Sequence, residues 1–314
     1  MDFIKHAIKL KRPNLREISV KNYANFLNRL SKLVEGHELK SLKFLKNIKK
    51  VIFYLDEMTF NSMRSTLTSI IVALDATDDI FKIKPEYDTL FAKAKIVYDK
   101  NLTTNKKSAK TSENWTTLGA LLKKQKALAK EVKNNHIADK QGLTTKNQKL
   151  LQNYLIASLY TLTPPRRNIY ATVQMMPMEK FKKLKADVLS KNNYLVFTPA
   201  LRKIFFYFGI QKSQRQAEHY PKQTVPPKLF KVLKMYVFFN ANQKYMLRNN
   251  RGGPYTSTGL SIKVKELLGI GSTMIRKIYI TEKTKESHDL IEATANAMGH
   301  SVGMAKAAYL KNDD

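Results

Sequence analysis

The chain has 314 residues, of which 43% are hydrophobic, so it is long and apolar enough for two ordinary domains with real cores. Lysine and arginine number 56 against 25 aspartates and glutamates, and the resulting net charge of +31 favours a polyanionic partner such as nucleic acid. The absence of cysteine excludes disulfides, cysteine-ligated zinc fingers and thiol catalysis. The alternative interpretation of the charge is a ribosome-like protein or the lysine-rich composition of an AT-rich genome.

The sequence contains no apolar segment of the length that membrane insertion requires. Its N-terminal stretch lacks the apolar region of a signal peptide, and no segment reaches the roughly 18 apolar residues of a membrane span. We therefore expect a soluble intracellular protein with no membrane partner.

Residues 14–105 are predicted to form a compact helical unit. Within Ser19–Val34 the apolar residues recur at the i, i+3, i+4 spacing of an amphipathic helix, for which Ser19 is the expected N-cap. Further helices are expected around 40–54, 58–75 and 86–99. The polar, lysine-rich segment Asn101–Asn114 is interpreted as a linker. This divides the chain into domains 1–110 and 111–314; an exposed loop within one domain is the alternative.

The second half is predicted to be mostly helical, with one small antiparallel sheet. β-branched and aromatic runs bounded by turn residues predict the strands, and amphipathic spacing predicts the helices. The expected strands are Tyr194–Thr198, Lys203–Gly209 and Gln223–Pro227. The expected helices are Trp115–Val132, Asn147–Leu162, Pro227–Asn240, Thr258–Leu268, one from about Ser272, His288–Met298 and a short terminal one. The fold class is therefore mainly α.

The C-terminal stretch GHSVGMAKAAY places His300 and Tyr309 nine residues apart. One unbroken helix would put these two side chains on opposite faces, because nine residues make two and a half turns. Ser301 and Gly303 are expected to break the helix, Ser301 as a cap and Gly303 as a turn residue. Taken alone, Tyr309 is an ordinary packing residue.

With its Gly-His-Ser box and a tyrosine at this distance, the stretch resembles the end of a tyrosine recombinase, the phage-type integrase family. The segment LYTLTPPRRNIY resembles the first arginine motif of integrases from large DNA viruses and their satellite viruses. Ser19–Val34 resembles the first helix of the family's core-binding domain, so the resemblance covers nearly the whole chain. It implies a helical core-binding domain followed by a catalytic domain of the DNA breaking-rejoining fold.

The resemblance carries catalytic roles onto five positions. Arg166 matches the first arginine, flanked by Arg167, although Ile169 stands where many members have an acid. Lys212 matches the lysine of the family's β-hairpin, with Lys222 as the fallback. Arg276 matches the second arginine, His300 the histidine and Tyr309 the nucleophile.

One position of the second arginine box departs from the family. Thr273 stands where the family has a histidine three residues before Arg276. A threonine can hydrogen-bond a phosphate but cannot act as a base near neutral pH.

The resemblance implies cleavage and rejoining of double-stranded DNA through a covalent 3′-phosphotyrosine, with no metal, ATP or other cofactor. It also implies a homo-tetramer on DNA, and a viral or mobile-element protein that acts in the host cell or virus factory. Two alternatives remain: a type IB topoisomerase, which uses the same five residue types, and a non-catalytic DNA-binding protein that retains the fold. The Gly-His-Ser box and the short distance from Arg276 to Tyr309 favour the recombinase.

Overall fold

The computed structural model describes residues 1–77, 82–103, 109–210, 221–283, 288–299 and 301–304. It is mainly helical, with one four-stranded mixed sheet. The chain divides into two compact units, Met1–Thr104 (unit 1) and Asn105–Asp314 (unit 2). Among the described residues, no helix combines the length and apolar character that a membrane span would need.

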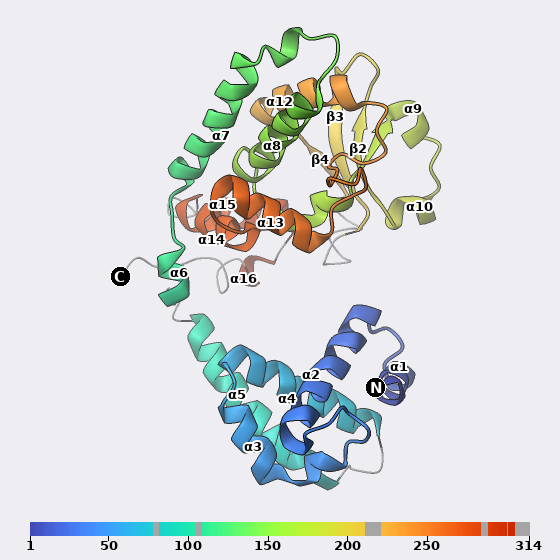
Figure 1. Ribbon diagram of the computed structural model, residues 1–314, viewed down its shortest axis with the longest axis vertical. Coiled ribbons are helices and arrows are strands. Elements are labelled where there is room, and N and C mark those ends of the chain that lie inside the picture. Colours follow the sequence, from blue (N-terminus) through green and yellow to red (C-terminus); the bar gives the residue numbers. More distant parts are fainter. Residues whose placement is uncertain (78–81, 104–108, 211–220, 284–287, 300, 305–314) are drawn as a thin grey trace. The chain divides into compact units, whose positions relative to one another are not determined.

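Unit 1 consists of helices packed around one apolar core (Figure 1). Its elements are α1 (Asp2–Lys11), α2 (Glu17–Glu35), η1 (Lys43–Lys46), α3 (Ile48–Asp56), α4 (Phe60–Ala76) and α5 (Lys84–Thr103). Helix α4 packs against α1, α2 and α5, so it is the central element of this unit. Its buried residues Leu67, Ile70 and Leu74 follow the helical period and form the middle of the core.

Two expectations for unit 1 need correction. Helix α1 lies outside the predicted helical region, and its Ile4 and Ile8, one turn apart, are fully buried in the core. Helix α2 begins at Glu17 with Arg16 at the N-cap, so Ser19 lies within the first turn instead of capping the helix. The charged residue Glu17 favours this earlier start, because an acid in the first turn is stabilised by the helix dipole.

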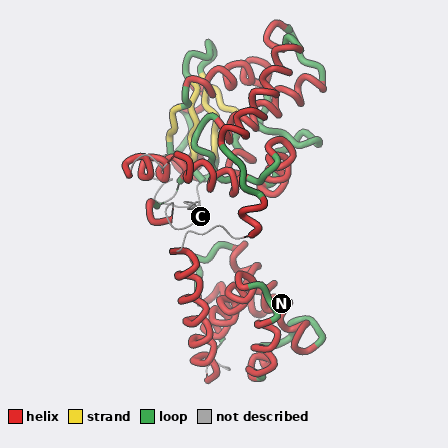
Figure 2. The backbone as a smooth tube through the Cα atoms, turned by 90° about the vertical axis from the view of Figure 1, so that its left-hand side faces the viewer, coloured by secondary structure: helices red, strands yellow, loops and turns green. Residues whose placement is uncertain are grey.

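Among the described residues, unit 2 contains the strands and the other helices (Figure 2). Its helices are α6 (Ala109–Glu113), α7 (Leu118–Asn134), η3 (Ile137–Asp139), α8 (Thr145–Thr161), η4 (Asn168–Thr172), α9 (Met178–Phe181), α10 (Ala186–Ser190), α12 (Pro227–Asn240), α13 (Ser257–Leu268), α14 (Ser272–Lys283), α15 (His288–Met298) and α16 (Val302–Met304). The expected linker Asn101–Asn114 is thus helical at both of its ends, since α5 extends to Thr103 and α6 begins at Ala109.

The sheet has the order β1-β2-β3-β4, formed by Gln174–Pro177, Asn193–Phe197, Ile204–Phe208 and Lys222–Thr224. Strands β2, β3 and β4 pair antiparallel, whereas β1 pairs parallel with β2. The prediction of a purely antiparallel sheet was therefore wrong. Strand β1 was missed because its sequence, QMMP, is short and contains no β-branched or aromatic residue.

Both faces of the sheet are covered, which is why β2 and β3 are apolar or aromatic apart from Asn193 at the start of β2. Leu195, Phe206 and Phe208 belong to the main core of unit 2, which they share with residues of α8 and α12. Tyr194, Val196 and Phe205 alternate with them and face Phe181, Leu184 and Leu189 around α9 and α10. The face that belongs to this main core is the one that bears on the candidate site.

Candidate active site

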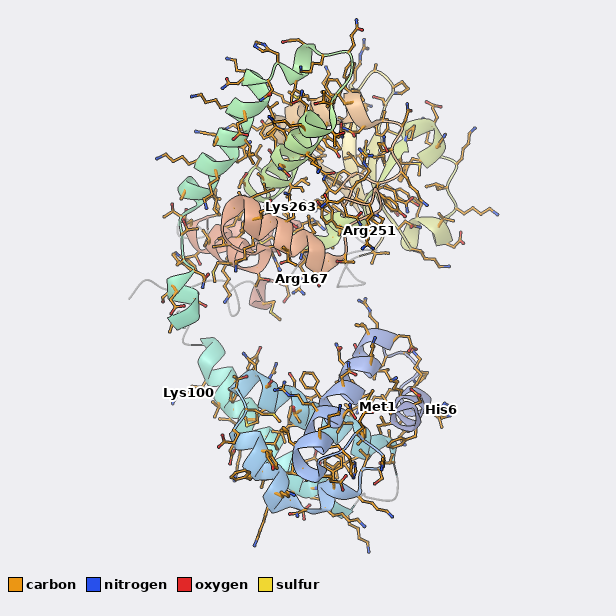
Figure 3. All side chains as sticks on the ribbon, in the orientation of Figure 1. Met1, His6, Lys100, Arg167, Arg251 and Lys263 are labelled. Atoms are coloured by element: carbon orange, nitrogen blue, oxygen red, sulfur yellow. The ribbon has the colours of Figure 1, made fainter. Side chains whose placement is uncertain are left out.

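The first arginine follows the end of α8. Helix α8 ends at Thr161, and Pro164 and Pro165 cannot continue it because proline lacks the backbone N–H that a helix requires. This puts Arg166 in an irregular segment before η4, with only 2% of its surface exposed. Arg167, the next residue, is half-buried (Figure 3).

Arg166 lies over aromatic rings. Its guanidinium carbon is 4.5 Å from the centroid of the Phe208 ring, within the range of a cation–π interaction. Tyr170 packs edge-on against Phe208 at 6.0 Å, and Phe206 stacks on Phe208 at 5.3 Å. Burial lowers the pKa of Arg166 to about 10, and Tyr170 opposes that shift. The guanidinium therefore stays protonated near neutral pH despite its burial.

Asn168 fixes the segment that carries Arg166. The Tyr160 hydroxyl donates to Asn168 Oδ1 at 2.9 Å, and Asn168 Nδ2 donates to the backbone oxygen of Ser257 at 2.9 Å. One amide side chain thus connects the last turns of α8, the start of η4 and the first turn of α13. Ile169 beside it packs against the main core, so this position makes an apolar contact.

The second arginine comes from α14. Arg276 is 2% exposed, and the amphipathic spacing of this helix turns it inward together with Ile275 and Ile278. Burial raises the pKa of Tyr160 well above its usual value, Tyr170 raises it further, and the charge of Arg276 lowers it. Thr273, one turn before Arg276, is exposed.

The two arginines therefore act electrostatically on the same pair of tyrosines. Tyr160 and Tyr170 pack edge to face with ring centroids 5.8 Å apart. The charge of Arg276 acts on Tyr160, and the charge of Arg166 lowers the pKa of Tyr170 against the larger effect of burial. Segments more than 100 residues apart in the sequence thus bring two buried guanidiniums to one aromatic cluster.

The C-terminal box is described only in part. Helix α15 ends before Gly299, whose φ of 78° is the left-handed conformation that glycine adopts without strain. Ser301 Oγ accepts from the backbone N–H of Met304 at 3.2 Å, so Ser301 caps α16 as expected. Gly303 lies inside α16, and the turn residue is Gly299 instead. His300 and Tyr309 lie outside the described residues, as does Lys212.

Lys222, the fallback for the hairpin lysine, lies on the other face of the sheet. It is exposed on β4, and its Nζ is 4.8 Å from the centroid of the Phe205 ring. Phe205 and Phe208 point to opposite faces of β3, because their separation in sequence is odd. Lys222 is therefore directed away from the face on which Arg166 lies.

Models of known protein families, curated proteins and solved structures provide no match to this chain.

The described residues contain no group of three or more histidines, aspartates or glutamates arranged to hold a metal ion. What they provide is positive charge on a rigid aromatic support, which suits the binding of a phosphate group. Guanidiniums can hold two non-bridging oxygens bidentately and stabilise charge that develops on them.

Four residues of this site were not predicted from the sequence: Tyr160, Asn168, Tyr170 and Phe208. Each acts through a contact with a distant segment. The dense aromatic run IFFYF was recognised as a strand, but no local pattern shows that its last ring lies under Arg166. The apolar face of α8, which ends in Tyr160, was the other sequence feature that could have indicated these residues.

Proposed function

We propose that this chain is a site-specific DNA recombinase that cleaves and rejoins strands through a covalent 3′-phosphotyrosine intermediate. The observation that supports it best is the pair of buried arginines, Arg166 and Arg276, at one aromatic cluster. They are also the two arginines that the resemblance to tyrosine recombinases selects.

The proposed chemistry needs this pair of charges. A DNA phosphodiester is shielded by its own negative charge, and attack by a phenol creates a five-coordinate phosphorus with more charge on its oxygens. Arg166 and Arg276 would hold those oxygens, with a planar fork that suits them better than a lysine ammonium. The ring of Phe208, which stacks on Phe206, supports the guanidinium of Arg166 from one side.

The remaining roles come from the sequence. The Tyr309 oxygen attacks phosphorus and releases its proton to water, the bond from phosphorus to the 5′-oxygen breaks, and Lys212 gives its proton to that leaving oxygen and regains one from water. His300 bonds a phosphate oxygen or assists the proton transfer. The phosphotyrosine conserves the energy of the broken bond, and attack by a 5′-hydroxyl of another strand reverses the steps and rejoins the DNA. Neither a metal ion nor ATP is needed for this exchange.

A non-catalytic DNA-binding protein is the second candidate, and Thr273 and Ile169 favour it because both depart from the family's pattern. The experiment uses two labelled duplexes that carry the end sequences of the native element, with a chelator present. Hybrid strands that join the two labels support the recombinase. A parallel reaction contains supercoiled plasmid, and its relaxation without hybrid strands identifies a type IB topoisomerase. Tight binding with neither product supports the non-catalytic alternative.

A further inference from the structure

A polar pocket of about 220 Å³ lies beside the first half of α8. It is lined by Thr145, Gln148, Lys149, Gln152, Arg248, Asn249, Asn250 and Gly252. Two of these lining residues, Lys149 and Arg248, are cationic, and none is acidic. Gln148 and Thr161, at the last turn before the Arg166 segment, are separated by about 20 Å of helix. The pocket is therefore distinct from the arginine site.

Arg248 is held in place by neutral groups. Its backbone N–H donates to Gln152 Oε1 and its backbone oxygen accepts from Gln152 Nε2, both at 2.9 Å. Its guanidinium donates to Gln243 Oε1 at 3.0 Å and to Asn240 Oδ1 at 3.3 Å. These amide oxygens orient the guanidinium without neutralising it, so its charge remains available to an anion.

The loop that forms one wall of the pocket is tightly braced. Asn249, near its start, bonds its far end twice: its backbone N–H donates to Gly253 O and its Nδ2 to Pro254 O, each at 2.8 Å. Gly252 has a φ of 79°, which a residue with a side chain rarely adopts. The exposed Arg251 adds a second positive charge, after that of Arg248, to this loop (Figure 3). A pocket already fixed in shape loses little conformational entropy when a ligand binds.

We propose that this pocket binds a phosphate group, with Arg248 and Lys149 as its charged ligands. The source of that phosphate rests on the proposed function: it belongs to the backbone of the same DNA whose cleaved phosphate lies at Arg166 and Arg276. A contact of this kind fixes the position of the duplex without reading its bases. A free phosphate would present the same chemistry.

The test compares two lysines of one helix. Lys149→Gln removes a charge that lines the pocket, and Lys146→Gln removes the same charge from an exposed position outside it. We expect Lys149→Gln to weaken binding of a duplex about fivefold and to lower the slope of log affinity against log salt by about 1. Lys146→Gln should change neither. Equal effects of both variants would overturn the proposal, since they would show only general surface charge.

A second titration distinguishes a DNA phosphate from free inorganic phosphate as the ligand. Duplex binding is measured in the Tyr309→Phe background, so that it does not depend on cleavage and stays readable if the proposed function fails. The thermal stability of wild type and of Lys149→Gln is also measured with millimolar inorganic phosphate. DNA would be overturned as the source if phosphate stabilised only the wild type while Lys149→Gln and Lys146→Gln bound the duplex equally well. Arg248→Lys serves as the second variant, and its thermal unfolding shows whether the loop still folds.

Discussion

At the scale of single residues, the central feature is how Arg166 is kept charged while buried. Its pKa falls to about 10 through desolvation, yet remains far enough above neutrality for full protonation. The face of the Phe208 ring provides partial compensation at 4.5 Å. The ring thus supports a guanidinium that stays charged although it is buried.

Replacing either buried arginine with lysine should slow formation of the protein–DNA adduct. We expect Arg166→Lys and Arg276→Lys each to lower the rate by about 10²–10³-fold, because an ammonium cannot reproduce the bidentate fork. Single-turnover adduct formation measures the rate. The matched control is Arg202→Lys, an exposed arginine in the turn between β2 and β3, which should keep the wild-type rate. Equal losses in all three variants would contradict the assignment.

Removing the ring under Arg166 should have a smaller effect on the same rate. Phe208→Leu takes away the cation–π contact, worth about 1–2 kcal/mol for a desolvated pair, and should slow adduct formation roughly tenfold. Phe208→Tyr keeps the ring and should restore most of the rate. A structural role alone predicts a different outcome: both variants would then lose thermal stability in proportion to any loss of rate.

At the scale of elements, the sequence predicted the helices and strands that depend on a local pattern of residues. Helices α12 and α15 have the predicted bounds, and the ends of β2 and β3 lie within one residue of the predicted ones. Strand β4 ends at Thr224, three residues before the predicted end. Strand β1 was not predicted because its parallel pairing with β2 depends on a connection through α9 and α10, which no period in QMMP reveals. The two arginines could be selected from the sequence. That both act on Tyr160 and Tyr170 could not be predicted, because it depends on how α8 and α14 pack.

Asn168 connects three elements, and removing its amide should loosen the arginine segment. Asn168→Ala breaks the bonds to Tyr160 and to Ser257, and leaves the buried Tyr160 hydroxyl without its acceptor. We expect a loss of about 1–3 kcal/mol in the free energy of unfolding. Urea denaturation measures it, with Asn135→Ala, whose exposed amide bonds only within its own helix end, as the control. A loss no larger than that of the control would show that the bridge contributes nothing.

At the scale of the whole molecule, buried phenols limit stability at alkaline pH. Burial raises the pKa of Tyr170 from 10.0 to about 12. Below pH 10 both the folded and unfolded chains keep this proton, so it has no effect. Between pH 10 and 12 the unfolded chain releases it and the folded chain does not, so stability falls as the pH rises.

Tyr170→Phe removes the hydroxyl that causes this loss of stability. Relative to wild type, its free energy of unfolding should improve by about 2 kcal/mol between pH 9 and pH 12. The lowered pKa of Arg166 acts in the opposite direction in both proteins, and because Arg166 and Tyr170 interact, the comparison reports on the two together. Urea unfolding of both proteins at each pH measures the difference. A difference that does not change with pH would contradict the buried, neutral phenol.

The covalent step is the central claim, and trapping the protein on nicked, labelled duplexes tests it most directly. The wild type is incubated without metal beside Tyr309→Phe and beside Tyr207→Phe, a half-buried tyrosine on the other face of the sheet from Phe208. We predict SDS-resistant adducts with wild type and Tyr207→Phe, and none with Tyr309→Phe. An adduct that persists in Tyr309→Phe would assign the wrong nucleophile. The absence of any adduct, despite tight and salt-sensitive binding, would contradict phosphotyrosine chemistry altogether.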